Sequence, residues 1–213
     1  MKAVVFDMDG VLFDTERLCM KGWSIVAKDE GIEGMEEVSM QCIGRNANDT
    51  KALVLQHFGQ DFPYEEFRGR VSDWFWQEIE RDGIPVKKGV RELLAFLKEN
   101  KWTVGLASSS KRESVEAHLK RSGILEYFSE IITGDMVEHS KPQPDIYLLA
   151  CDKLGVKPQE AYAIEDSPNG IRSAYAAGMK PIMVPDMIAP DEEMERMSFR
   201  IFKDLLEVRD FLG

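Results

Sequence analysis

The second half of the 213-residue chain alternates regularly between short apolar runs and stretches with the three- and four-residue spacing of helices. Strands that alternate with helices along a chain form a parallel sheet covered by helices on both faces. We therefore expect an α/β protein. The expected strands are 102–107, 130–133, 161–164 and 181–184, and the expected helices are 90–98, 112–121, 144–154, 168–177 and 205–211.

One further strand is expected far from these, at the N-terminus. The apolar run 3–6 reads as a buried strand, which Gly10 ends. The pattern over 15–81 is helical throughout, with helices expected after Thr15, over 48–58 and over 64–81. We predict a core domain of residues 1–14 and 82–213 and an inserted helical cap domain of residues 15–81. A helical module inserted at the ligand-binding edge of a sheet is well placed to act as a lid.

Composition excludes several classes of partner. The formal net charge is −11, and an acidic surface repels nucleic acid and anionic membranes. The three cysteines are far apart, which favours free thiols and a reducing compartment. The chain has no apolar run of membrane-spanning length, and the N-terminal strand leaves no room for a signal peptide. We expect a cytoplasmic monomer whose partner is a small molecule.

The first strand is followed at once by two carboxylates, Asp7 and Asp9. They leave the sheet at the carboxyl end of a strand, which is where ligands bind in open α/β sheets. Two crowded carboxylates repel each other unless a cation or a shared proton offsets the repulsion. Mg²⁺ is bound in proteins by one or two carboxylates together with substrate phosphate. A polar turn is the alternative interpretation.

Three other strand ends carry polar groups of different kinds. Ser108 begins a serine run that suits either an anion site or a helix N-cap. Lys141 stands between a serine and two prolines, as a fixed point charge or as a solvated loop lysine. Glu165 and Asp166 form a second acid pair, whose alternative role is helix capping. Together these groups are what metal-assisted phosphoryl transfer to a carboxylate requires.

These residues resemble the haloacid dehalogenase superfamily, in the branch with a helical cap after the first strand. Residues 7–15 match its first motif, Ser108 the second, Lys141 the third and Glu165-Asp166 the fourth, in the right order across nearly the whole chain. Within that branch the chain is similar to the β-phosphoglucomutase and sugar-phosphate phosphatase group. The resemblance implies a Rossmann-like core with an inserted cap, and a Mg²⁺-dependent phosphatase that acts through an aspartyl-phosphate.

The resemblance also implies a role for each matching residue. Asp7 would be the nucleophile and Asp9 the general acid and base. Mg²⁺ would be held by Asp7, the carbonyl oxygen of Asp9 and Asp166, with Glu165 acting directly or through water. The phosphoryl group would be bound by Ser108, Ser109, Lys141 and the backbone near Gly10. Thr15, at the start of the cap, would hold the Asp9 side chain in one rotamer.

The same resemblance leaves the reaction open between phosphatase and sugar phosphomutase. The cap cations and the histidine that a mutase uses correspond here to Ala47, Ile43 and Cys19, which favours the phosphatase. Arg45 and Lys111 are candidate substrate contacts, with exposed surface positions as the alternative. Asp9 and the acid pair at 165–166 argue against a metal-free dehalogenase. The complete set of site residues argues against a non-catalytic protein that only binds phosphorylated metabolites.

The three histidines, His57, His118 and His139, are scattered along the chain without a second ligand at metal spacing. We interpret them as surface or packing residues.

Overall fold

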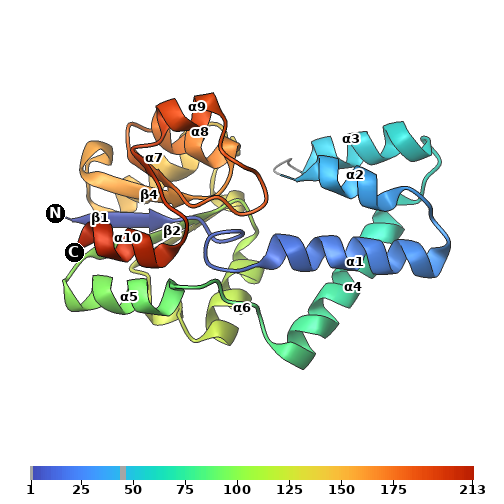
Figure 1. Ribbon diagram of the computed structural model, residues 1–213, viewed down its shortest axis with the longest axis horizontal. Coiled ribbons are helices and arrows are strands. Elements are labelled where there is room, and N and C mark those ends of the chain that lie inside the picture. The colour runs from blue at the N-terminus through green and yellow to red at the C-terminus, as the bar shows by residue number, and fades with distance from the viewer. Residues whose placement is uncertain (1, 44–46) are drawn as a thin grey trace. The chain divides into compact units, whose positions relative to one another are not determined.

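The computed structural model of the protein describes residues 2–43 and 47–213, which form two compact units. The core unit consists of Met1–Asp14 and Pro85–Gly213, and the cap unit of Thr15–Ile84. The core unit is α/β, whereas the described residues of the cap unit form helices and connecting loops (Figure 1).

Six parallel strands form the sheet of the core unit, in the order β3-β2-β1-β4-β5-β6. The first strand of the chain therefore lies in the middle of the sheet, and the strand order reverses there between β2 and β4. This reversal is the topological switch point at which α/β sheets bind ligands. The strands are β1 Ala3–Phe6, β2 Thr103–Ser108, β3 Glu130–Thr133, β4 Ala161–Glu165, β5 Lys180–Met183 and β6 Arg200–Ile201.

Helices cover both faces of this sheet, which confirms the predicted fold class. Helices α7 and α8 lie on one side, and α5 and α10 pack together on the other (Figure 1). The helices are α5 Val90–Glu99, α6 Arg112–Ser122, α7 Asp145–Leu154, α8 Pro168–Ala176, α9 Glu192–Met197 and α10 Leu205–Leu212. Single turns of 3₁₀-helix occur at η1 Leu125–Tyr127, η2 Gly134–Met136 and η3 Pro158–Glu160.

Strand β1 is completely buried along its whole length. Because successive side chains of a strand point to opposite faces, Ala3 and Val5 share one face. They belong to a hydrophobic cluster that includes Tyr147 of α7 and Ala174 of α8. Full burial of a large aliphatic side chain contributes roughly 1.5–3 kcal/mol. This burial fixes the strand whose end carries Asp7.

The two chain segments that connect the core to the cap are hydrogen-bonded to each other within the core unit. The Asp14 N–H donates to the carbonyl oxygen of Pro85, and the Lys87 N–H to that of Leu12, both at 2.9 Å. Between these two bonds, Phe13 pairs with Val86 in an antiparallel bridge. The chain therefore leaves the core and re-enters it along adjacent paths.

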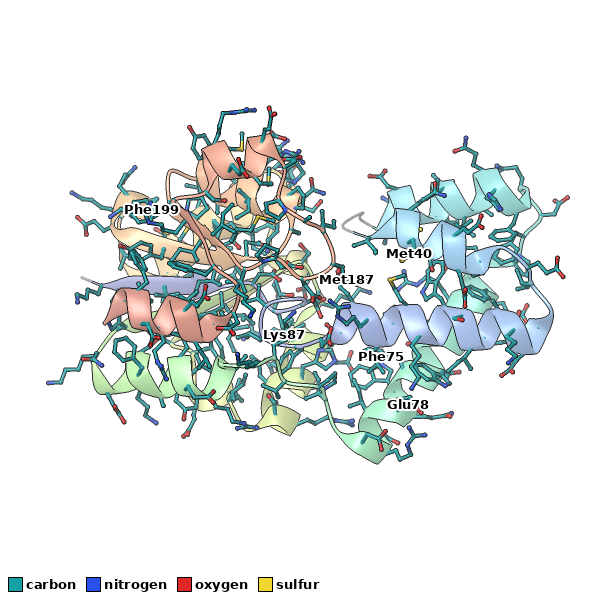
Figure 2. The ribbon with its side chains drawn as sticks, viewed as in Figure 1. Met40, Phe75, Glu78, Lys87, Met187 and Phe199 are labelled. Atoms are coloured by element: carbon teal, nitrogen blue, oxygen red, sulfur yellow. The ribbon has the colours of Figure 1, made fainter. Side chains whose placement is uncertain are left out.

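The cap unit contains α1 Thr15–Glu30, α2 Met35–Cys42, α3 Ala47–Phe58 and α4 Tyr64–Asp82. Trp23 of α1 and Phe67 of α4 meet edge to face in its hydrophobic core, with ring centroids 5.5 Å apart. Gly22 lets these two helices approach closely, because a Cβ there would lie 2.7 Å from the ring of Trp74. Near the end of α4, Glu78 (labelled in Figure 2) forms an ion pair with Arg81 at 2.7 Å, in which the Glu78 side chain is largely buried and the Arg81 side chain is exposed.

Helix α2 was not expected as a separate helix. It has only eight residues, too few for a strong periodic pattern, and it buries Met35, Val38 and Ser39 on one side. Gly34 begins it in the left-handed region, with φ of +82°. In the core, α9 begins after Asp191, whose side chain caps the helix by accepting from the Met194 N–H at 2.8 Å.

Among the described residues, the longest and most apolar helices still fall short of what crossing a membrane requires.

Candidate active site

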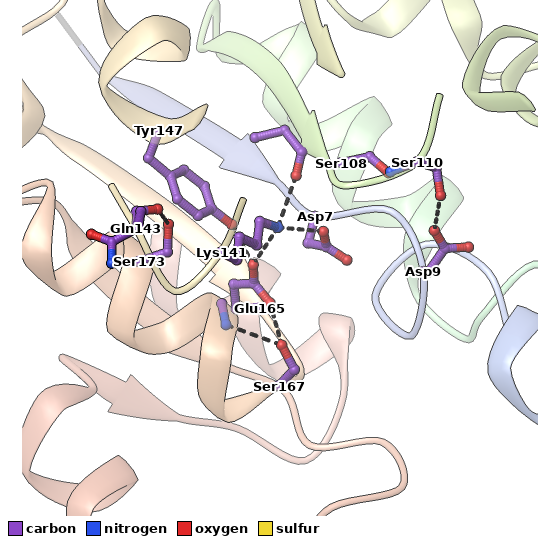
Figure 3. Close-up of polar contacts among 12 residues, drawn as sticks. Asp7, Asp9, Ser108, Ser110, Lys141, Gln143, Tyr147, Glu165, Ser167 and Ser173 are labelled. Carbon is purple, nitrogen blue, oxygen red and sulfur yellow. Dashed lines mark hydrogen bonds and ion pairs between the residues drawn. The ribbon is translucent and has the colours of Figure 1, made fainter. Parts of the chain in front are cut away.

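The carboxyl ends of three central strands bring the acidic and basic groups together. Asp7 follows β1, which lies between β2 and β4, and the register pairs Phe6 with both Leu106 and Ile164. The Asp7 N–H continues this pairing by donating to the carbonyl oxygen of Ile164 at 2.9 Å. One residue further along β4, Glu165 therefore lies beside Asp7 (Figure 3).

One position in the turn after Asp7 can be occupied only by glycine. Gly10 has a φ of +83°, and a Cβ there would lie 2.1 Å from the Oδ2 atom of Asp166. Both the left-handed backbone and the close approach exclude other side chains. Gly10 thereby lets the first acidic turn pack directly against the second acid pair.

Lys141 connects the three strand ends. Its Nζ donates to Asp7 Oδ1 at 2.6 Å, to Glu165 Oε1 at 2.7 Å and to the carbonyl oxygen of Ala107 at 3.0 Å (Figure 3). The side chains of Lys141, Asp7 and Glu165 are only 7%, 11% and 0% exposed. Lys141 is therefore a buried charge and not a solvated loop lysine.

Burial and charge shift the titration of this group strongly. Burial raises the pKa of Asp7 well above its usual range. The positive charge of Lys141 lowers this pKa, whereas the neighbouring Glu165 and Asp9 carboxylates raise it further. Burial alone would lower the pKa of Lys141, but Asp7 and Glu165 outweigh it and raise the pKa. Lys141 is therefore an ammonium ion at neutral pH, and one ammonium has to serve two buried carboxylates.

A buried cluster of carboxylates could hold a metal ion. Asp7, Glu165 and Asp166 each offer an oxygen atom, and the three oxygens lie within 4.8 Å of one another. An all-oxygen set of carboxylates suits hard divalent cations such as Mg²⁺. A cation there would also offset the repulsion from Glu165 and Asp9, which adds to the effect of burial on the pKa of Asp7. The donor chemistry and the electrostatics of the site therefore both fit a divalent cation.

Asp9 and the serines of the second strand end form a separate polar group. The Ser110 hydroxyl donates to Asp9 Oδ2 at 3.0 Å, and the Ser110 N–H donates to Ser108 Oγ at 3.1 Å. Ser108 is fully buried, and the N-cap of α6 is Lys111. Ser108 therefore shapes the turn before the helix and does not cap it.

Helix capping also fails to explain the second acid pair. The N-cap of α8 is Ser167, whose hydroxyl oxygen accepts from the Gly170 N–H at 3.1 Å. Glu165 and Asp166 precede this cap and are both buried, at 0% and 5% exposure. These two acids are therefore part of the buried charged cluster around Asp7 and not helix caps.

Comparison with known proteins identifies the family. The model of the haloacid dehalogenase-like hydrolase family matches residues 4–184. The chain belongs to the haloacid dehalogenase-like hydrolases. It is a phosphoric monoester hydrolase, which decides against the dehalogenase and the non-catalytic alternatives.

Two curated relatives of this hydrolase represent the two enzyme alternatives. It is 32% identical to a phosphorylated carbohydrates phosphatase from Thermotoga maritima over 85% of this chain and 84% of the relative. It is 31% identical to a β-phosphoglucomutase from Bacillus subtilis over 84% of this chain and 81% of the relative. Its structure resembles a Thermotoga maritima crystal structure provisionally named β-phosphoglucomutase, with a TM-score of 0.84, 28% identity and coverage of 100% and 98%.

The other predicted site residues of this hydrolase differ in how far they are buried. Ser109 and Lys111 are exposed in the loop before α6. Thr15 is buried in the cap unit, so its expected hold on Asp9, a core residue, stays a prediction. Arg45 lies outside the described residues.

Two polar contacts in this hydrolase were not predicted. The Ser110 hydroxyl is available to orient Asp9, to which it donates a hydrogen bond. Tyr147 of α7 donates its hydroxyl to Glu165 Oε1 at 2.6 Å. Both residues lie a few positions beyond a predicted motif, and no spacing rule distinguishes them from ordinary loop or core residues.

Of the two roles expected for the histidines, surface or packing, His118 has the packing role. Its ring meets that of Phe13 at a centroid distance of 5.9 Å, and it is 5% exposed. Burial lowers its pKa, while the charge of Asp9 acts in the opposite direction.

Proposed function

We propose that this chain is a Mg²⁺-dependent phosphatase that hydrolyses a small phosphorylated carbohydrate through an aspartyl-phosphate on Asp7. The observation that carries the proposal is the buried Asp7 carboxylate, 2.6 Å from Lys141 Nζ and clustered with Glu165 and Asp166. A nucleophilic carboxylate needs nearby positive charge, because its substrate is an anion.

In the first step, an Asp7 oxygen attacks the phosphorus atom, and the bond from phosphorus to the carbohydrate oxygen breaks. Asp9 gives its proton to that leaving oxygen. In the second step, Asp9 takes a proton from water, whose oxygen attacks the phosphorus. The bond to Asp7 then breaks and inorganic phosphate leaves, so one ester and one water yield one alcohol and one phosphate.

The other core residues stabilise this chemistry. Lys141 offsets the repulsion between Asp7 and the phosphoryl group, and Ser108 with the backbone N–H groups after it binds phosphoryl oxygens. Ser110 orients Asp9 through its 3.0 Å hydrogen bond. The cation would be held by Asp7, Asp166, Glu165 and the Asp9 carbonyl oxygen. When bound, it supplies positive charge that polarises the phosphoryl group.

A cavity within the cap unit supports a carbohydrate as the substrate. It has a volume of about 280 Å³, and its walls combine the aromatic residues Trp23 and Tyr64 with the hydroxyls of Ser39 and Thr50. Aromatic rings pack on the C–H faces of sugars while hydroxyl groups exchange hydrogen bonds with them. The lining of this cavity therefore suits a carbohydrate.

A sugar phosphomutase is the second candidate, because a relative named β-phosphoglucomutase is 31% identical. A mutase must hold a second phosphate in the cap. Cys19, Ile43 and Ala47, at the positions expected to carry its polar groups, all line the cap cavity without adding positive charge. Among the described lining residues, Arg68 is the one cation, and it shares the cavity with Glu16.

The decisive experiment measures inorganic phosphate released from a panel of sugar, polyol and nucleoside phosphates with Mg²⁺. We expect release from carbohydrate phosphates, its loss in EDTA and its recovery when Mg²⁺ is restored. The same panel includes β-glucose 1-phosphate with a bisphosphate activator. Formation of glucose 6-phosphate without phosphate release would favour the mutase, and activity indifferent to chelation would contradict the metal requirement.

A further inference from the structure

The two oxygens of the Glu165 carboxylate have different surroundings. Oε1 accepts two short hydrogen bonds, from Lys141 Nζ at 2.7 Å and from the Tyr147 hydroxyl at 2.6 Å. Oε2 accepts a single long one, from the Ser167 hydroxyl at 3.4 Å. Within the described residues, one oxygen is therefore saturated by the protein and the other is nearly unused.

Tyr147 contacts both charges of this pair. It is completely buried, and the Lys141 ammonium lies 5.0 Å from the centre of its ring while its hydroxyl reaches Glu165 (Figure 3). A phenol hydroxyl carries its proton at neutral pH and an ionised carboxylate only accepts, so the Tyr147 hydroxyl is the donor of this bond.

The backbone closes the other side of the carboxylate. A Cβ on Gly170 would lie 1.9 Å from both Cδ and Oε2 of Glu165, so the carboxylate rests against the first turn of α8. The loop between Lys141 and α7 is tied to the same helix, because the Ser173 hydroxyl donates to the Gln143 carbonyl oxygen at 2.6 Å. Glu165 is thus held from opposite sides by two helices.

We propose that Tyr147 is a positioning residue, which holds Glu165 Oε1 on the lysine side and so fixes the Glu165 carboxylate beside Asp7, where the divalent cation would bind. This inference rests on the proposed Mg²⁺-dependent function. Groups that orient a metal ligand without touching the metal typically change metal affinity or activity by about 10- to 100-fold. A phenylalanine would fill the same space and contact Lys141 with the same ring face, but it would leave Oε1 with one donor.

The test is Tyr147→Phe, measured by calorimetric titration of the metal-free protein with Mg²⁺ and by steady-state phosphatase kinetics. We expect Mg²⁺ binding to weaken about tenfold and kcat to fall by a similar factor, with little change in KM for the substrate. Tyr175→Phe is the matched control, because Tyr175 lies on α8 with 53% exposure, and it should bind Mg²⁺ like the wild type.

A double-mutant cycle separates positioning from general packing. If Tyr147 acts through Glu165, Tyr147→Phe should weaken Mg²⁺ binding far less in a Glu165→Gln background than in the wild type. Unchanged Mg²⁺ affinity in Tyr147→Phe, or equal losses in both backgrounds, would overturn the inference. Thermal unfolding in EDTA checks that each variant is folded. A wild-type enzyme that hydrolyses phosphate esters equally well without Mg²⁺ would instead contradict the proposed function.

Discussion

The core unit and the cap unit use charged side chains in opposite ways. In the core, Asp7, Lys141 and Glu165 are almost fully buried and bonded to one another. In the cap, ion pairs lie at the surface: Arg70 and Lys51, which pair with acids at 2.7 Å, are 53% and 44% exposed. Exposed pairs of this kind contribute little to stability, because water competes for both partners.

This difference corresponds to two properties of an enzyme, the reaction that it catalyses and the substrate that it selects. Buried charges are costly to maintain and cluster at functional sites, so we expect the reacting groups in the core unit. The cap cavity is built mainly from aromatic, aliphatic and hydroxyl side chains, which distinguish shapes without fixing a reaction. We therefore expect substitutions of core charges to change kcat, and substitutions in the cap cavity to change the choice of substrate.

The largest effect is expected for Asp7→Asn, which keeps the shape of the side chain and removes the nucleophile. We predict a loss in kcat of about 10⁴-fold or more, measured as phosphate release, with the fold retained in circular dichroism. Asp73→Asn changes an exposed cap carboxylate on α4 in the same way and should leave kcat unchanged. Near-normal turnover in Asp7→Asn would refute the nucleophile assignment.

Asp9→Asn should have the next largest effect, and one that depends on the leaving group. We predict a fall in kcat of about 10²–10⁴-fold on an alkyl phosphate, because its leaving oxygen needs a proton. An activated aryl phosphate leaves without help and should lose much less in the first step. Single-turnover kinetics on both substrates measure the difference, and equal losses would argue against the acid role.

Two glycine-to-alanine substitutions, one in each unit, compare how tightly the backbone is packed at the two positions. Gly170→Ala places a Cβ 1.9 Å from the Glu165 carboxyl group and should reduce the free energy of unfolding by about 1–3 kcal/mol. Gly69→Ala, inside α4, meets no atom within 4 Å and should increase it by about 0.5–1 kcal/mol. Urea unfolding measures both. The comparison fails if the two variants change stability in the same direction.

The smallest effect on activity is expected at the exposed His139–Asp145 pair of the core unit. Like the exposed ion pairs of the cap, this pair should contribute little. His139 donates a hydrogen bond from Nδ1 to Oδ1 of the Asp145 carboxylate at 2.9 Å, and this bond, together with the carboxylate charge, raises the pKa of His139. Because the folded pKa is raised, the stabilisation is complete below the unfolded pKa of about 6.5 and is lost as the pH rises through the folded value. In Asp145→Asn, NMR titration should show the pKa of His139 falling back toward 6.5, with kcat unchanged.

Much of the core could be predicted from the sequence because parallel-sheet topology is strongly constrained. Strands and helices in alternation define the sheet, and the carboxyl ends of its strands meet at one edge. Asp7, Lys141 and Glu165 could therefore be placed in one site before their contacts were known. Their burial could not, since the sequence around Lys141 is equally typical of an exposed loop.

The unpredicted parts depend on tertiary packing. Tyr147 looks like any core residue of α7, and its hydroxyl gains a role only because that helix packs beside the end of β4. Helix α2 is short, and its buried residues are too few to mark a helix on their own. Ser110 looks like a member of a serine run, and the local sequence does not show which hydroxyl faces Asp9.

The hydrogen-bonded connection between Asp14 and Pro85 has a consequence for how such proteins diversify. Its two strands already have the spacing of a hairpin, so removing the whole insertion would leave ends that a short turn can join. Tolerance of an insertion depends on the burial and hydrogen bonding of the flanking backbone, and here the two flanking segments are hydrogen-bonded to each other. The cap is in this sense an exchangeable module, and evolution could replace it without disturbing the register of the sheet beneath.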